Sequence, residues 1–394
     1  MKILYITLSD IRLNEQGIYP DLINALKASG HDITVCIADS PENIEKTVLR
    51  EEYGVRFLRV LVGENFNVGL IKKGINTLKM EPVLKASVKK YLKDESFDLI
   101  LYATPPVSFA GVVRYCKRYF KAKTFLMLKD IFPQNAVDIG LFGKSSLIHR
   151  YFKAQEKKLY EYSDVIGCMS FGNLEYIQGH YPFVPKEKLM VFPNTVKING
   201  EEDLKGPETS KDPSKVRFVF GGNLGRPQAI DFLLDAMADE RLAGREDIEF
   251  LIIGKGSEKE KVRKASEKLP GLTFIEYLPV SEYNRIMKAC DVGIISLDHR
   301  FTIPNYPSRI LGYMAMKKPV LACTDEITDI RSLVEKEGKF GLWCSSDDID
   351  GFVNAVLKLS GDRALREEMG NKGYTYLKDN FNVQRSVDLI EKSL

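Results

Sequence analysis

The strongest constraint on the fold is an alternation of short apolar runs with helical segments along almost the whole chain. In the first half, the runs that we interpret as strands are 2–7, 31–38, 55–60, 97–103, 124–128, 164–169 and 189–192. Segments with helical character, such as 20–29 and 108–120, separate them. Short apolar runs separated by helices are typical of a parallel sheet that is covered on both faces. We therefore expect an α/β fold.

The length and a polar interruption predict two domains. A chain of 394 residues is too long for one core. The segment 197–215 is polar and contains Gly and Pro, and the strand–helix alternation restarts after it. We expect a first doubly wound, Rossmann-like domain at 1–196, a linker at 197–215, a second such domain at 216–378, and a last helix at 379–394 that crosses back to the first domain. Ligands in such folds bind at the carboxyl ends of strands, here in a central cleft between the domains.

Charge and cysteine usage narrow the class of protein. The formal net charge is +3, but residues 72–158 hold 18 Lys and Arg against 7 Asp and Glu. This basic window is either a set of solvated helix faces or a surface for anionic lipid, and nucleic acid fits it less well. The six cysteines are scattered, so neither a disulfide framework nor a zinc site is expected. With no apparent signal peptide or membrane span, we expect a cytoplasmic protein.

Two turns in the second half predict a phosphate-binding site. In the stretch 301–322, a loop with Pro304 and Pro307 leads into a helix that opens at Ser308 and Arg309. A helix start presents unpaired N–H groups, and a guanidinium is a forked donor for phosphate oxygens. Upstream, Gly221-Gly-Asn-Leu-Gly225 forms a second turn between a strand and a helix. Together they favour a diphosphate, as in a nucleotide sugar. The alternatives are a tight turn at the glycines and a helix cap at Ser308.

Further side chains near these turns are candidates for donor binding. The donor candidates around the turns are Gly222, Asn223, Arg226, Lys255, Asp298, Thr302 and Asn305. Arg226 and Lys255 would add positive charge to that of Arg309, whereas the last three would bind donor hydroxyls or merely form turns. The acidic run Asp347-Asp-Ile-Asp350 is interpreted as a helix start rather than a metal site.

The order and spacing of several motifs resemble those of glycosyltransferase family 4. The motifs that carry the resemblance are Gln16-Gly17, Leu128-Lys-Asp-Ile-Phe-Pro133, Phe192-Pro-Asn-Thr195, Gly221-Gly-Asn-Leu-Gly225, Leu251-Ile-Ile-Gly-Lys-Gly256, Ala289-Cys-Asp-Val292, Pro304-Asn-Tyr-Pro-Ser-Arg309 and Lys318-Pro-Val-Leu-Ala322. The resemblance covers nearly the whole chain. It implies the GT-B fold and is strongest to members that build capsule, O-antigen or other surface polysaccharides.

The resemblance also implies roles for residues in both halves. Asp130 and Lys129 stand at a strand end where acceptor and donor meet, and an Asx turn is the alternative for Asp130. Gly17 lies in the first strand-to-helix loop and would let the backbone approach the donor. Gly312 departs from the pattern, because many members carry there a Glu that binds the donor ribose.

The function that these observations predict is a retaining, metal-independent glycosyltransferase without a cofactor. It would move a sugar from a nucleoside-diphosphate sugar, UDP-linked by resemblance, to a polyprenyl-diphosphate-linked saccharide. Such an acceptor would place the enzyme on the inner face of the cell membrane, docked on an anionic surface. Two alternatives remain open: a nucleotide-sugar 2-epimerase of the same fold, and a non-catalytic partner that binds nucleotide sugars.

Overall fold

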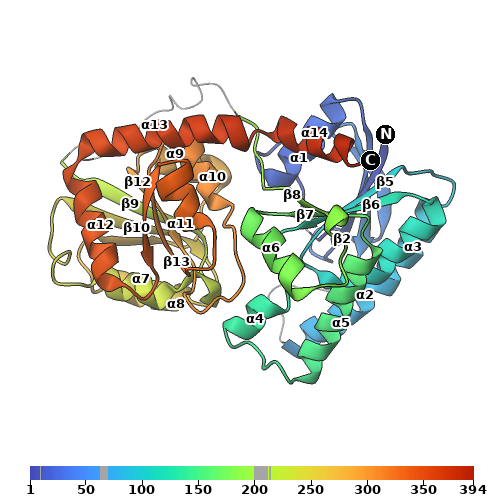
Figure 1. Cartoon of the computed structure of the whole chain (residues 1–394), viewed down its shortest axis with the longest axis horizontal. Helices are drawn as coiled ribbons and strands as arrows, with labels where there is room; N and C mark the ends of the chain where they lie inside the picture. Colours follow the sequence, from blue (N-terminus) through green and yellow to red (C-terminus); the bar gives the residue numbers. More distant parts are fainter. Residues whose placement is uncertain (9, 63–69, 199–211, 213) are drawn as a thin grey trace. The chain divides into compact units, whose positions relative to one another are not determined.

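The computed structural model describes residues 1–394 except residues 9, 63–69, 199–211 and 213. Most of the linker expected at 197–215 lies outside the described residues. The chain divides into two units (Figure 1), which we call unit 1 (Met1–Lys197 with Val383–Leu394) and unit 2 (Ile198–Asn382). Unit 1 is therefore built from two separate stretches of sequence.

Unit 1 is organised around a largely parallel sheet. Its strands are β1 (Lys2–Thr7), β2 (Asp32–Asp39), β3 (Val48–Glu52), β4 (Val55–Leu61), β5 (Leu99–Ala103), β6 (Lys123–Leu128), β7 (Val165–Cys168) and β8 (Leu189–Val191). They lie in the order β3-β4-β2-β1-β5-β6-β7-β8. Neighbours from β4 to β8 run parallel, and the apolar runs of the central strands are buried, as expected for a sheet covered on both faces. The exception is β3, which pairs antiparallel with β4 and was not predicted.

Helices cover both faces of this sheet (Figure 1). The helices of unit 1 are α1 (Ile18–Ala28), α2 (Leu70–Tyr91), α3 (Ala110–Phe120), α4 (Gln134–Asp138), α5 (Leu147–Tyr162), α6 (Phe171–His180) and the last helix, α14 (Val383–Lys392). Short 3₁₀ turns precede α3 (η1, Val107–Phe109) and β8 (η2, Lys186–Lys188).

The last helix completes the core of unit 1. Val387 and Ile390 of α14 pack into the same apolar cluster as Leu22 and Leu26 of α1. The amide of Val383 donates to the carbonyl oxygen of Val196 at 3.0 Å. The division of the chain thus falls at Val383, a few residues beyond the boundary expected at 378/379.

Unit 2 is a second doubly wound domain. Its strands are β9 (Val216–Asn223), β10 (Ile248–Lys255), β11 (Leu272–Ile275), β12 (Val292–Ser296), β13 (Val320–Thr324) and β14 (Gly341–Ser345). They lie in the order β11-β10-β9-β12-β13-β14, and each neighbouring pair is parallel. The order reverses direction between β9 and β12, which is the position at which doubly wound folds bind ligands. The predicted α/β fold with two Rossmann-like units is confirmed.

Helices alternate with the strands of unit 2. They are α7 (Ile230–Met237), α8 (Lys259–Ser266), α9 (Val280–Lys288), α10 (Arg309–Ala315), α11 (Ile330–Ser332), α12 (Ile349–Gly361) and α13 (Arg363–Asn380), with η4 (Arg226–Gln228) before α7 and a π-helical turn, η5 (Leu333–Glu337), after α11. The side chain of Asp362 caps α13 by accepting from the amide of Leu365 at 2.8 Å. None of the helices in the described part of the chain combines the length and apolar character needed to cross a bilayer.

Candidate active site

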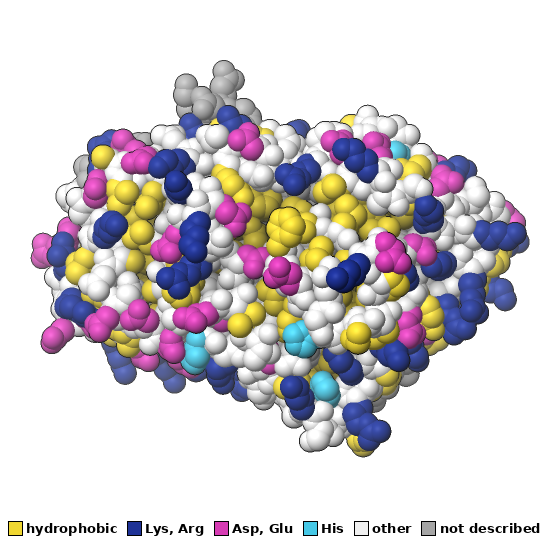
Figure 2. All heavy atoms as spheres, in the orientation of Figure 1, with side chains coloured by type: hydrophobic (Ala, Val, Ile, Leu, Met, Phe, Trp, Pro, Cys, Tyr) yellow, Lys and Arg dark blue, Asp and Glu magenta, His cyan; other side chains and the backbone are white. Residues whose placement is uncertain are grey.

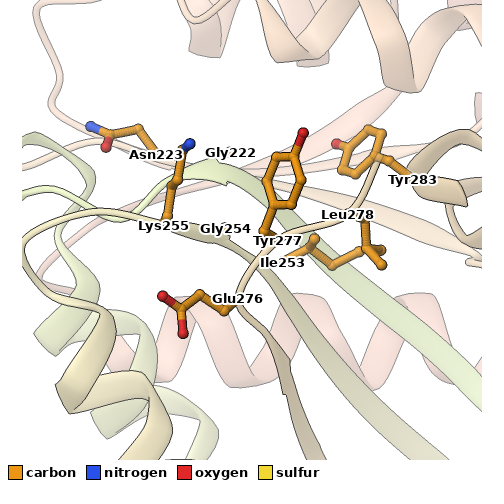
Figure 3. A pocket seen from close by; sticks show the side chains of 9 residues that line it. All are labelled: Gly222, Asn223, Ile253, Gly254, Lys255, Glu276, Tyr277, Leu278 and Tyr283. Atoms are coloured by element: carbon orange, nitrogen blue, oxygen red, sulfur yellow. The ribbon is translucent and has the colours of Figure 1, made fainter. Parts of the chain in front are cut away.

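A cavity of about 300 Å³ opens at the carboxyl ends of β9 and β10 in unit 2 (Figure 3). It is lined by Gly222, Asn223, Ile253, Gly254, Lys255, Glu276, Tyr277, Leu278 and Tyr283. The parallel register sets Gly222 beside Gly254 and Asn223 beside Lys255, so two predicted turns meet at one edge of the sheet. This is the edge at which ligands bind in doubly wound folds.

Packing alone explains two of the glycines in these turns. A Cβ on Gly254 would overlap the carbonyl oxygen of Gly222, and a Cβ on Gly221 would overlap the hydroxyl of Tyr283. Gly222 has a φ of +136°, a conformation that favours glycine. Glycine is thus favoured at these positions by the tight turn itself, which was the alternative to ligand binding. Gly222 also lines the cavity, so a ligand-binding role is compatible with this packing.

Arg309 carries an unused positive charge beside this cavity. Its Cζ lies 4.4 Å from the ring centroid of Phe220 and would be 3.2 Å from a Cβ on Gly222. Its Nη1 is buried without a hydrogen-bond partner among the described residues. Burial lowers the pKa of the Arg309 guanidinium, although nearby tyrosines oppose that shift. A buried guanidinium that no described carboxylate neutralises is a favourable position for an anionic ligand.

The start of α10 offers fewer amides than the sequence predicts. The amides of Ile310 and Leu311 already donate to the carbonyl oxygens of Pro307 and Ser308, at 3.3 and 3.1 Å. The exposed side chain of Ser308 forms no helix cap. The guanidinium of Arg309, rather than a row of helix amides, is thus the main positive feature at this end of α10.

Lys255 and Tyr277 form one wall of the cavity. The Nζ of Lys255 lies 5.1 Å from the ring centroid of Tyr277, whose residue is 66% exposed (Figure 3). Glu276 points away from them and pairs with Lys259 and Arg263 at 2.5 and 2.7 Å. An exposed aromatic face next to a lysine can stack on a planar ring that carries phosphate. Tyr277 and Tyr283 were missed at the sequence level, since no motif marks them.

The remaining predicted donor residues lie outside the cavity lining. Arg226 is exposed within η4, and Thr302 is also exposed. The side-chain Nδ2 of Asn305 donates to the carbonyl oxygen of Ile303 at 3.4 Å. Asp298 is paired with Arg300 through bonds of 2.8 and 2.6 Å, and although burial opposes it, this pairing holds the pKa of Asp298 below its usual value. These contacts are those of turns, and donor binding by these residues stays a prediction.

In unit 1, Lys129 and Asp130 follow β6 at the carboxyl edge of the sheet. The hydroxyl oxygen of Thr104 accepts from both of their amides, at 3.1 and 3.4 Å. The Nζ of Lys129 lies 5.2 Å from the ring centroid of Phe192. Neither side chain forms a salt bridge with a described residue, and burial lowers the pKa of Lys129 to about 7 and raises that of Asp130 to about 7. Shifts of this size are frequent at catalytic sites.

Two residues at the start of α1 complete the description of unit 1. Burial and the nearby Asp130 raise the pKa of Tyr19 to about 12, so this tyrosine of α1 stands close to the carboxyl group and was not anticipated. Gly17 has an extended backbone with a φ of 164°, and a Cβ there would make only ordinary contacts with Pro20. Glycine is therefore not required at position 17 by local structure.

The acidic run near β14 has a structural role. The side chain of Asp348 accepts from the amide of Gly351 at 2.8 Å and caps α12, as interpreted from the sequence. Within the described part of the chain, no three His, Cys, Asp or Glu side chains converge as ligands for a metal ion.

Comparison with known proteins gives matches in both units. Residues 21–199 match the model described as Glycosyltransferase Family 4, and residues 215–362 match that of Glycosyl transferases group 1. A probable glycosyltransferase of Pseudomonas aeruginosa, WbjE, is 26% identical over 275 residues. The match covers 66% of this chain and 66% of WbjE, so the chain spans just under two thirds of that relative.

Solved structures share the fold over the full length. A sucrose-phosphate synthase from Thermosynechococcus elongatus has a TM-score of 0.73 at 16% identity and covers 100% of this chain and 98% of its own. The Anabaena protein HepE, solved in complex with UDP-glucose, has a TM-score of 0.68 at 16% identity and covers 100% of both chains. With a glycosyltransferase family model matched in each unit and this shared architecture, the chain has the GT-B fold of two Rossmann-like units.

Proposed function

We propose that this chain is a retaining glycosyltransferase that transfers a sugar from a UDP-linked donor to a lipid-linked saccharide. The observation that carries the proposal is the buried, unpartnered Nη1 of Arg309 beside Gly222 and the cavity of unit 2. A diphosphate would neutralise this charge, with Lys255 adding a second cation from the cavity wall. The complex of HepE with UDP-glucose supports a uridine nucleotide as the carrier of the sugar.

In this proposal the two units divide the chemistry. Arg309 and Lys255 stabilise the negative charge that develops on the diphosphate when the bond between the sugar and the phosphate breaks. Unit 1 binds the acceptor, and the carboxylate of Asp130 accepts the proton that the acceptor hydroxyl loses as the new glycosidic bond forms. Burial raises the pKa of Asp130 to about 7, so its carboxyl is suited to take up that proton and release it again near neutral pH.

The acceptor and the cellular location belong to the same proposal. The similarity to WbjE and the family 4 motifs support a role in surface polysaccharide synthesis, with a polyprenyl-diphosphate-linked acceptor. An enzyme with such an acceptor works on the inner face of the cell membrane, and the excess of basic residues in 72–158 supports contact with anionic lipid.

A thermal-shift screen against UDP-, GDP- and TDP-sugars tests the donor assignment. A ligand at a hundred times its Kd adds about 2.7 kcal/mol to the stability of the native state, so one base should raise the Tm clearly. Arg309→Met keeps the bulk of the side chain without its charge and should abolish the shift. The matched control is Arg363→Met, which removes an exposed cation at the start of α13, outside the cavity lining, and should keep the shift. A full shift in Arg309→Met would overturn the proposal.

Product analysis separates this function from its two alternatives. Incubation with the donor and a membrane extract should transfer label from the sugar to lipid. Epimerised sugar formed from donor alone would identify a 2-epimerase, and donor binding without transfer would identify a non-catalytic partner.

A further inference from the structure

The loop between α4 and α5 and the first turn of α5 expose an apolar surface, which we call the α4–α5 tip (residues 141–150). Leu141, Leu147 and Ile148 are 57%, 80% and 49% exposed. Within the described part of the chain, no other stretch of ten residues exposes three large hydrophobic side chains. Such a concentration on a soluble surface marks an interaction site more often than a scatter of single residues does.

The exposed side chains are held outward by ordered structure. Phe142, between them, packs inward, with ring centroids 6.2 Å from Phe132 and 6.5 Å from Phe152. Ser146 starts α5 by accepting from the amide of His149 at 3.2 Å, and its hydroxyl donates to the carbonyl oxygen of Gly143 at 2.7 Å. The aromatic anchor and the helix cap therefore fix which side chains of the α4–α5 tip face solvent.

The charges around the α4–α5 tip are almost all positive. The basic residues from 141 to 158 are Lys144, Arg150, Lys153, Lys157 and Lys158. The acidic residue of this stretch, Glu156, is buried and lies 2.8 Å from the Nζ of Lys153. In Figure 1 the α4–α5 loop forms an extremity of unit 1, and Figure 2 shows basic and hydrophobic side chains together at this end. Apolar side chains flanked by cations fit a surface that is apolar inside and anionic outside.

We propose that the α4–α5 tip docks unit 1 on an anionic phospholipid bilayer. Leu141, Leu147 and Ile148 enter the interfacial layer, while Lys144 and Arg150 contact the lipid phosphates. A second copy of this chain is a poorer occupant, because two such tips would bring like charges together. The proposal deepens the proposed function, since it names the surface that meets the membrane of a lipid-linked acceptor.

Vesicle flotation with the full chain tests the proposal. Vesicles of phosphatidylcholine alone are compared with vesicles that also contain phosphatidylglycerol, and binding is expected only to the second kind, weakening as salt is added. Leu147→Ser combined with Ile148→Ser should reduce partitioning about tenfold or more, because both side chains leave the interface. Lys144→Glu combined with Arg150→Glu should also reduce partitioning about tenfold or more, because the contacts with the lipid phosphates are lost.

The matched control is Tyr53→Ser, which removes another exposed side chain of unit 1 (59% exposed) from the β3–β4 turn and should leave partitioning unchanged. Equal vesicle binding by the wild type and both tip variants would overturn the proposal. The proposal would also be overturned if the wild type were a dimer in solution and the Leu147→Ser, Ile148→Ser variant were a monomer, because the surface would then bind a second copy.

Nucleotide binding by the same variants distinguishes this proposal from the proposed function. The tip variants should keep the thermal shift with the donor, since the cavity lies in unit 2. A wild type that floats with vesicles but binds no nucleotide sugar would remove the proposed function and leave the docking surface standing.

Discussion

The carboxyl edges of the two parallel sheets hold different kinds of charge. In unit 2 the edge presents Arg309, whose guanidinium stays protonated at any physiological pH and has a buried, unpartnered nitrogen. In unit 1 the edge presents Lys129 and Asp130, whose pKa values are both about 7. One edge thus carries a permanent cation and the other a titratable pair.

The comparison teaches that topology positions a site but does not determine its chemistry. Both units are doubly wound, so both collect side chains at the ends of parallel strands. A permanent cation suits the binding of an anion, whereas a group with a pKa near the working pH suits proton transfer. This division of charge between the two units leads to four predictions.

Asp130→Asn should reduce kcat about a thousandfold, because the carboxylate that accepts the proton is lost. In the wild type, Asp130 must be ionised to act, so kcat/KM should rise with pH through about 7 on the acid side. The pH profile of transfer measures this, and the thermal shift with donor should be unchanged in the variant. A rate of transfer that does not depend on pH between about 5 and 8 would contradict the assignment of proton transfer to unit 1.

Gly254→Ala should lower the free energy of unfolding by about 2–4 kcal/mol, because its Cβ would overlap the backbone of β9. Denaturant unfolding measures the change. Gly312→Ala is the matched control, since a Cβ there meets nothing within 4 Å and replaces glycine within α10. It should stabilise the chain by about 0.5–1 kcal/mol. Equal costs at the two positions would contradict the packing described for the cavity.

Tyr277→Ala should weaken donor binding about tenfold, because an aromatic face that stacks on the nucleobase is lost. Tyr277→Phe keeps the ring and should bind as the wild type does. Isothermal titration with the best nucleotide from the screen measures both. If Tyr277→Phe loses as much affinity as Tyr277→Ala, the hydroxyl rather than the ring makes the contact.

Gly17→Ala should change the stability of unit 1 by less than about 0.5 kcal/mol, because the backbone is extended and the added methyl group fits. Turnover should fall if the backbone at Gly17 approaches the donor, as the family resemblance implies. Steady-state kinetics beside denaturant unfolding separates the two effects. Unchanged turnover would remove Gly17 from the site.

The sequence predicted the fold well because local signals and burial agree. The central strands are continuous apolar runs, and β1 is found at the residues 2–7 that were predicted for it. The strand β3 was missed because Val-Leu-Arg-Glu-Glu is charged and only partly buried at the sheet edge. Its pairing depends on β4, which a local pattern does not reveal.

The candidate site was predicted only in part, since its formation depends on contacts between distant residues. Gly222, Asn223 and Lys255 line the cavity as motif residues at strand ends. The approach of Arg309 to Gly222 joins residues far apart in sequence, and Tyr277 stands in a stretch without a motif. Asp298 was a candidate for hydroxyl binding, but the sequence does not show that Arg300 turns back to pair with it.

The position of α14 has a consequence for how the protein is made. Val387 and Ile390, which fill the core of unit 1, are synthesised after the whole of unit 2. During translation, unit 2 can therefore fold before unit 1 is complete, because α14 is the last element of unit 1 to be synthesised. Until this closing helix is synthesised, the apolar side chains of α1 lack the partners that cover them in the native core.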